Sequence, residues 1–188
     1  MNRASVDPEL AALRGELIER AAADQRARAE LDPAAPTPEQ WETVHLVDED
    51  NVRWFAPIVA VHGWPGRRTV GVDGAHAAWV LAQHAPAPYR ACWLPKLRAA
   101  VANRDAAPRD LAFLSDRVAT DQQRAQRYGT QWLRLGTEAA GRLYPLHRPA
   151  EVNLARADVG LAPIPDAEIA TAYLSYDEVA AATSGGSR

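Results

Sequence analysis

Alanine occupies 39 of the 188 positions, and 14 prolines divide the chain into segments. Alanine has the highest helix propensity of the amino acids, whereas proline opens a helix at its first position or interrupts it. Apolar residues recur at helical spacing in most of these segments, as in Leu10, Leu13 and Leu17. The pattern predicts a mainly α-helical protein, a single compact helical domain of about seven to eight helices over residues 1–182. A disordered tail, residues 183–188, is expected to follow.

One stretch departs from the helical pattern. Two short apolar segments, residues 131–135 and 142–146, flank a turn-like segment that contains Gly136 and Gly141. Two such segments around a glycine-containing turn are typical of a β-hairpin. The sequence therefore predicts a small β-hairpin near residues 131–146.

Local signals set several helix boundaries in the first half of the chain. The segment Thr37–Gln40 has the pattern of a capping box, so we expect a short helix to begin there. Asp48 is expected to cap a separate helix over about residues 49–62. Residues 63–74 contain four glycines and are predicted to form a loop, and the next helix is expected over about residues 75–85.

Charge and cysteine content exclude several classes of protein. The net charge is −3 and the isoelectric point is about 6.0, which argues against nucleic acid or an anionic membrane as the main partner. The single cysteine excludes an intramolecular disulfide, and residues 1–9 lack the apolar stretch of a secretory signal. We therefore expect a cytoplasmic protein with no nucleic-acid and no membrane partner. A homodimer is left open.

Asp24 is the first residue that does not fit a purely structural role. It shares a helical stripe with the apolar residues Leu10, Leu17 and Leu31, which are spaced seven apart. A buried carboxylate costs several kcal/mol unless it is paired. Two interpretations are open: an ion pair with Arg28 on a solvent-facing part of the helix, or a carboxylate directed into a pocket.

Two histidines near helix ends are candidates for proton transfer. His62 ends a predicted helix and precedes the glycine-rich segment, where it either caps the helix or acts as a general acid or base. His84 lies near the end of the next helix, beside Gln83. We expect His62 to be the proton-transfer group with Asp24 as its partner, and we count His84 as a third catalytic candidate. Gln83 is a candidate substrate-binding residue.

Further polar and aromatic residues are candidates for substrate binding. A guanidinium group such as that of Arg117 can hold a carboxylate or phosphate through two hydrogen bonds. Equally, these side chains could tie helices together or satisfy a buried turn. Tryptophan in a loop can form the wall of a ligand site. The candidates are Trp64, Asp116, Arg117, Tyr128 and Gln131.

Four segments of the chain resemble ordered motifs of a bacterial family of unknown function, the DUF6624 family. They read HGWP at 62–65, AAWVLAQHA at 77–85, LAFLSDRV at 111–118 and YGTQ at 128–131. The likeness covers roughly residues 24–161, and Pro86 departs from it because the family pattern has an acidic residue there. The resemblance implies no reaction. It places the following residues on pattern positions: Asp24, Gln25, His62, Trp64, Trp79, Gln83, His84, Asp116, Arg117, Tyr128 and Gln131.

Two hypotheses about function follow from these residues. The first is a small-molecule enzyme that uses general acid–base chemistry, in hydrolysis, elimination or cyclisation, centred on His62 with Asp24. The second is a non-catalytic module that binds a ligand or partner and whose polar residues form a buried structural network. Glycine-rich nucleotide motifs and the HExxH zinc motif are absent from the sequence, so we expect no cofactor and no metal.

Overall fold

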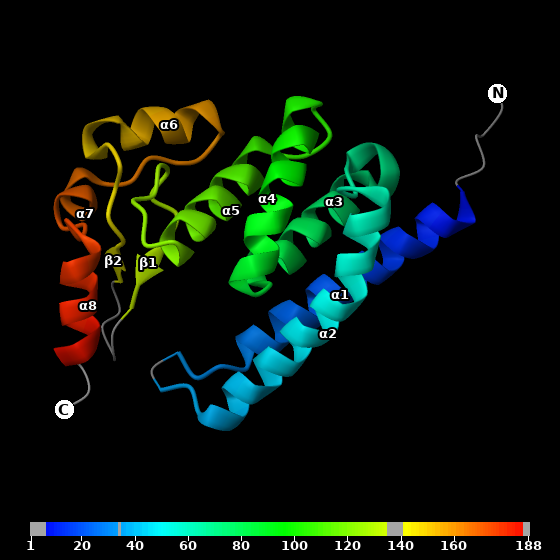
Figure 1. Cartoon of the computed structure of the whole chain (residues 1–188), viewed down its shortest axis with the longest axis horizontal. Coiled ribbons are helices and arrows are strands. Elements are labelled where there is room, and N and C mark those ends of the chain that lie inside the picture. Colours follow the sequence, from blue (N-terminus) through cyan, green and yellow to red (C-terminus); the bar gives the residue numbers. More distant parts are fainter. Residues whose placement is uncertain (1–6, 34, 135–140, 186–188) are drawn as a thin grey trace. The chain divides into compact units, whose positions relative to one another are not determined.

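The computed structural model describes residues 7–33, 35–134 and 141–185 of the chain. These residues form eight α-helices, one short 3-10 helix and two strands, which confirms the prediction of a mainly helical protein with a small hairpin (Figure 1). The chain divides into two compact units, residues 1–107 and residues 108–188. The expectation of one domain over residues 1–182 stays a prediction.

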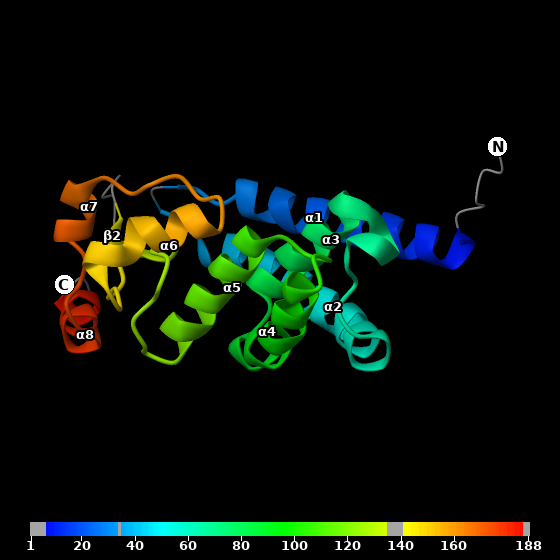
Figure 2. The same cartoon turned by 90° about the horizontal axis from the view of Figure 1, so that it is seen from above.

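The first unit is built from four helices. Helix α1 packs against both α2 and α3, as both views show, and α3 also contacts α4 (Figures 1 and 2). In the core, the buried ring of Phe55 meets Trp64 and Trp93 edge to face, at centroid distances of 6.1 and 5.1 Å. The bounds of the four helices are α1, Pro8–Ala29; α2, Pro38–His62; α3, Arg67–His84; and α4, Ala87–Ala102.

Helix α2 is one continuous helix, so the prediction of two helices separated at Asp48 is wrong. The capping box at its start is confirmed: the Gln40 N–H donates to Thr37 Oγ1, and the Thr37 N–H donates to Gln40 Oε1. Asp48 lies inside the helix, between the buried residues Val44 and Val52. Its carboxylate binds a side chain of another helix and does not cap α2.

Helix α3 begins inside the segment that was predicted to be a loop. The N–H of Arg67 donates to the carbonyl oxygen of Asp105 and the N–H of Arg68 donates to its carboxylate, both at 2.8 Å. Contacts distant in sequence therefore satisfy the first donors of this helix. One of the glycines interrupts the helical conformation: Gly71 has φ +74° and ψ 177°. Only glycine adopts such angles readily.

Among its described residues, the second unit holds the hairpin, four α-helices and one 3-10 helix. Strand β1 pairs antiparallel with β2, with Trp132 opposite Leu143 and Leu133 opposite Arg142, and part of the predicted turn, residues 136–140, lies outside the described residues. The unit has its own small core: Leu143, Val152, Ile164 and Ala172. The elements are α5, Pro108–Asp121; β1, Trp132–Leu133; β2, Arg142–Leu143; the 3-10 helix η1, Pro149–Glu151; α6, Val152–Asp158; α7, Asp166–Ala170; and α8, Tyr176–Gly185.

Helix α8 corrects the prediction for the end of the chain. Residues 183–185, expected to belong to a disordered tail, form the last turn of this helix. The hydroxyl groups of Thr183 and Ser184 donate to the carbonyl oxygen of Ala180, one turn earlier. Short polar side chains can thus donate to carbonyl groups within a helix, and their presence does not have to mark the end of the helix. Residues 186–188 lie outside the described residues.

Candidate functional site

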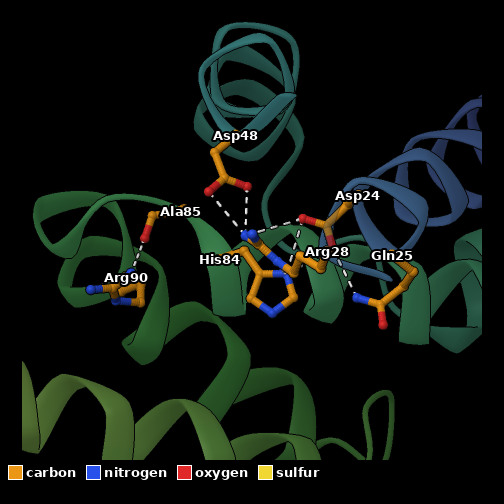
Figure 3. A network of polar contacts seen from close by, with 7 residues as sticks. All are labelled: Asp24, Gln25, Arg28, Asp48, His84, Ala85 and Arg90. Atoms are coloured by element: carbon orange, nitrogen blue, oxygen red, sulfur yellow. Dashed lines mark hydrogen bonds and ion pairs between the residues drawn. The ribbon is translucent and has the colours of Figure 1, made fainter. Parts of the chain in front are cut away.

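Helix α1 places the carboxylate of Asp24 at the centre of a polar cluster in the first unit. The side chain of Asp24 is fully buried. The Nδ1 atom of His84, at the end of α3, lies 2.8 and 3.0 Å from its two oxygens, and the amide of Gln25 donates to it at 2.8 Å (Figure 3). Asp24 is thus a buried carboxylate that contacts a histidine 60 residues away in the sequence.

Arg28 joins this carboxylate to a second one on α2. Its Nη2 atom donates to both oxygens of Asp48, at 2.7 and 2.9 Å, and lies 3.4 Å from Asp24 (Figure 3). One guanidinium therefore faces two carboxylates, and three helices meet at these side chains. We call the five residues the Asp24 cluster: Asp24, Gln25, Arg28, Asp48 and His84.

The two carboxylates of the cluster differ in the direction in which their pKa values move. Burial alone would raise the pKa of Asp24, but the hydrogen bond from His84 and the charges of His84 and Arg28 together lower it below its usual value. Burial raises the pKa of Asp48, and the nearby charge of Asp24 adds to this, against the effect of Arg28. Asp24 is the carboxylate that the cluster holds ionised most firmly.

The contacts of Nδ1 bear on which nitrogen of the His84 ring carries the proton. Nδ1 lies close to the Asp24 carboxylate and also 3.0 Å from Nε of Arg28, and one nitrogen cannot donate to the first and accept from the second. We assign the proton to Nδ1, donating to Asp24, because an ionised carboxylate is the stronger acceptor. In the neutral ring Nε2 then carries a lone pair. None of the described residues forms a hydrogen bond with Nε2, which points away from Asp24 in Figure 3.

His84 lines two pockets. The first, which we call the α1/α3 pocket, has a volume of about 460 Å³ and lies between α1 and α3, with Ala22 and Gln83 among its walls. The second, which we call the α2/α4 pocket, has about 270 Å³ and is lined by residues of α2, the end of α3 and Arg90 of α4. His84 thus contacts the buried carboxylate of Asp24 and also lines two pockets.

Two of the predicted catalytic residues are brought together, and the third is not. Asp24 contacts His84, whereas His62 is exposed at the end of α2. His62 follows Asp48 by 14 residues on the same helix, which corresponds to roughly 20 Å along the helix axis. The expected pairing of His62 with Asp24 is therefore corrected: the partner of Asp24 is His84.

The predicted binding residues of the first unit have different surroundings. Gln83 is only 8% exposed and lines the α1/α3 pocket. Trp64 is half-buried in the loop after α2 and packs edge-on against Phe55, in the core. Trp64 is therefore placed as a core residue, whereas Gln83 is placed at a cavity.

In the second unit, Asp116 holds the loop of residues 127–130. Its buried carboxylate accepts hydrogen bonds from three backbone N–H groups, those of residues 127, 128 and 130, and from the hydroxyl of Thr130, at 2.8 to 3.2 Å. Burial nevertheless raises the pKa of Asp116 above its usual value. Tyr128 takes part through its backbone: its carbonyl oxygen accepts from Arg156. Both oxygens of this carboxylate thus accept hydrogen bonds from groups of the protein itself.

Arg117 and Gln131 belong to the same network as that loop. Nη1 of Arg117 donates to the side-chain oxygen of Gln131 at 3.1 Å. The buried Gln126 accepts from the backbone N–H of Gln131 and donates to its carbonyl oxygen. These bonds are of the kind that a buried turn requires, which is one of the interpretations that the sequence left open for these residues.

Asp48 is the cluster residue that sequence reasoning missed, because it was assigned to a helix cap. A signal was present: Asp48 continues the stripe of Val44, Val52 and Phe55, three of the buried residues of α2. In a continuous helix this stripe faces inward, so a carboxylate on it requires a partner. Arg28 was recognised only as a neighbour of Asp24 on α1.

Two other kinds of feature, a metal site and a membrane-spanning helix, are absent from the described residues. No group of three or more His, Cys, Asp or Glu side chains there has an arrangement that could hold a metal ion. Among the helices of the same residues, none combines the length and the apolar character that crossing a membrane requires.

Comparison with known proteins places the chain in a family. A family model described as a family of unknown function, DUF6624, matches residues 11–174, which include every residue of the Asp24 cluster. No curated protein and no solved structure matches the chain. The resemblance seen in the four sequence motifs is thereby confirmed: the chain belongs to the DUF6624 family.

Proposed function

We propose that this protein is an enzyme that transfers protons on a small molecule, with His84 as the proton-accepting group. The observation that carries the proposal is the contact between His84 Nδ1 and the buried carboxylate of Asp24, on an imidazole that also lines a pocket of about 460 Å³. A histidine held by a buried carboxylate on one nitrogen and open on the other is a common arrangement of a general base.

The proposed chemistry uses each member of the cluster in turn. Nε2 of His84 accepts a proton from a bound molecule, or from a water that attacks it, and the ring becomes an imidazolium. Asp24 stabilises that positive charge through Nδ1–H. Arg28 and Asp48 hold the Asp24 carboxylate in place. In the second half of the reaction Nε2–H returns the proton to the leaving group, which suits hydrolysis, elimination or cyclisation.

The structure favours His84 over His62 for this role. His84 has both a buried carboxylate partner and a pocket, whereas His62 is exposed and lies roughly 20 Å along α2 from Asp48. Asp24 keeps the role of partner that the sequence suggested. A cytoplasmic location and a homodimer stay predictions from the sequence.

One observation favours the alternative, a structural network without catalysis. The cluster connects three helices, since Arg28 of α1 binds Asp48 of α2 and Asp24 of α1 contacts His84 of α3. A purely structural network does not require Nε2 of His84 to be reactive, whereas the proposed catalysis does. An unreactive Nε2 would therefore exclude the catalytic role.

Chemical modification tests the proposal before any substrate is known. Diethyl pyrocarbonate acylates an accessible, unprotonated imidazole nitrogen, and peptide mass spectrometry locates the product. We expect His84 to be modified at neutral pH, with the exposed His62 as the internal reference for the reagent. Modification of His62 while His84 remains untouched would contradict the proposal and favour the structural network.

Turnover of a panel of small esters, amides and lactones is the second test. A general acid or base typically contributes a factor of about 10² to 10⁴ in rate, so the variant His84→Gln should lose activity by that factor. The matched variant His62→Gln should keep it. The reverse result would return the catalytic role to His62.

A further inference from the structure

The walls of the α1/α3 pocket are mainly apolar. Its volume of about 460 Å³ lies within the range of small-molecule sites. Small alanine side chains of both helices leave this space open, and longer apolar side chains close its sides. The apolar lining residues are Ile18, Ala21, Ala22, Ala77, Trp79 and Val80. Such walls stabilise a ligand that is itself largely apolar.

Two carboxylates near this pocket, those of Asp73 and Asp24, are each paired with a basic side chain. Asp73 lines the pocket and forms an ion pair with Arg14 of α1, whose guanidinium lowers the pKa of Asp73 to about 2. A positive charge on His84 would be matched by Asp24. Neither carboxylate is therefore available to a charged ligand, which would lose its hydration on entering the mainly apolar pocket, whereas an uncharged ligand would not suffer this loss.

Gln83 supplies a hydrogen-bonding group in the wall of the pocket that lacks a partner. The residue is 8% exposed, and its side-chain oxygen is buried without a hydrogen bond to any described residue. A buried amide oxygen without a partner costs free energy. Rotation of the carboxamide by 180° exchanges its oxygen and nitrogen, so this side chain can direct either its acceptor oxygen or its N–H donors toward a ligand in the pocket.

We propose that the α1/α3 pocket binds an uncharged, mainly apolar molecule that carries a carboxamide group, whose N–H donates to the side-chain oxygen of Gln83. The ligand would lie beside Nε2 of His84. That this class of molecule is the substrate rests on the proposed function, whereas binding in the pocket does not.

Four probes of nearly equal shape test the chemistry of the ligand. Benzamide is the uncharged amide, benzoate and benzamidinium are its charged counterparts, and acetophenone replaces the amide nitrogen by a methyl group. Binding to the full chain is followed by NMR through the indole N–H of Trp79, which the variant Trp79→Phe assigns. We expect benzamide to bind at least tenfold more tightly than either ion, and several-fold more tightly than acetophenone.

Three variants locate the binding. Ala22→Leu fills the pocket and should abolish benzamide binding, whereas Ala23→Leu, one position further along α1 and about 100° around it, is the matched control that should leave binding intact. Gln83→Met keeps the size of the side chain but removes its polar group, so benzamide and acetophenone should then bind equally. A thermal melt of each variant checks that it is folded.

The results separate this inference from the proposed function. If His84→Gln still binds benzamide but has lost turnover, both the binding site and the proposed function are supported. If the wild type binds benzamide but His84 does not react with diethyl pyrocarbonate, only the binding site is supported. Equal or tighter binding of benzoate or benzamidinium overturns the assignment of an uncharged ligand. Absence of benzamide binding, or binding that survives Ala22→Leu in a folded protein, overturns the site.

Discussion

Replacing Asp24 by Asn removes the negative charge at the centre of the Asp24 cluster while nearly keeping the shape of the side chain. The carboxylate contacts His84 and Gln25 at hydrogen-bond distance and lies 3.4 Å from a guanidinium nitrogen of Arg28. A hydrogen bond to a charged group contributes about 1.5 to 3 kcal/mol, and breaking a buried ion pair costs about 3 to 5 kcal/mol. Asn can still accept one of these bonds. We therefore expect Asp24→Asn to lower the free energy of unfolding by about 3 kcal/mol at pH 7.

The pH dependence of this loss has a definite sign. Folding lowers the pKa of Asp24 below its ordinary value of 3.8. The ionised Asp24 therefore stabilises the folded protein fully at pH values above that ordinary value, and the contribution disappears as the pH falls through the lower folded-state pKa. The difference in unfolding free energy between wild type and Asp24→Asn should be largest near neutral pH. It should shrink below about pH 4.

Chemical denaturation followed by tryptophan fluorescence measures this difference, because five of the six tryptophans lie in the first unit. Asp50→Asn is the matched control: the side chain of Asp50 is 58% exposed and binds Arg20 at 2.6 Å, and an exposed pair of this kind contributes less than about 1 kcal/mol. The reasoning would be refuted if Asp24→Asn cost no more than Asp50→Asn at pH 7. A loss that did not change on acidification would also contradict it.

Three further variants test other parts of the structure. Arg28→Met leaves two carboxylates without their shared cation, so we expect the free energy of unfolding to fall by about 3 to 5 kcal/mol at pH 7, and part of the loss to be recovered on acidification in the same denaturation assay. Asp116→Ala removes the acceptor for the loop 127–130 and should strongly increase hydrogen–deuterium exchange of its amides, while exchange in the first unit stays unchanged. Gly129 has φ +62°, so Gly129→Ala should cost about 1 to 2 kcal/mol, and an unchanged melting temperature would contradict this.

The parts of the fold that depend on local signals could be predicted from the sequence. The capping box of Thr37 and Gln40 marks a helix start that the structure confirms. The start of α3 could not be predicted, since its first donors are satisfied by Asp105, which is distant in sequence. Glycines indicated a loop there, and tertiary hydrogen bonds stabilise a helix instead, with one interruption at Gly71.

In the candidate site too, contacts between residues close in sequence could be predicted, whereas contacts between distant residues could not. Asp24 stood out because a carboxylate on an apolar stripe requires a partner, and Arg28 one turn later was visible as one of its partners. The stronger contact, with His84, joins residues 60 positions apart, and helical periodicity carries no information about such a distance. His62 and His84 both end helices, so sequence alone gave no physical ground for choosing between them.

The position of His84 has a consequence for both cavities that it borders. His84 lines both the α1/α3 pocket and the α2/α4 pocket, so a molecule in either space can contact the same side chain. A molecule that turned or charged this ring from one side would change the shape and the potential met by a molecule on the other. By thermodynamic reciprocity, an occupant of either cavity that acts on the ring must alter the affinity of the other by the same factor.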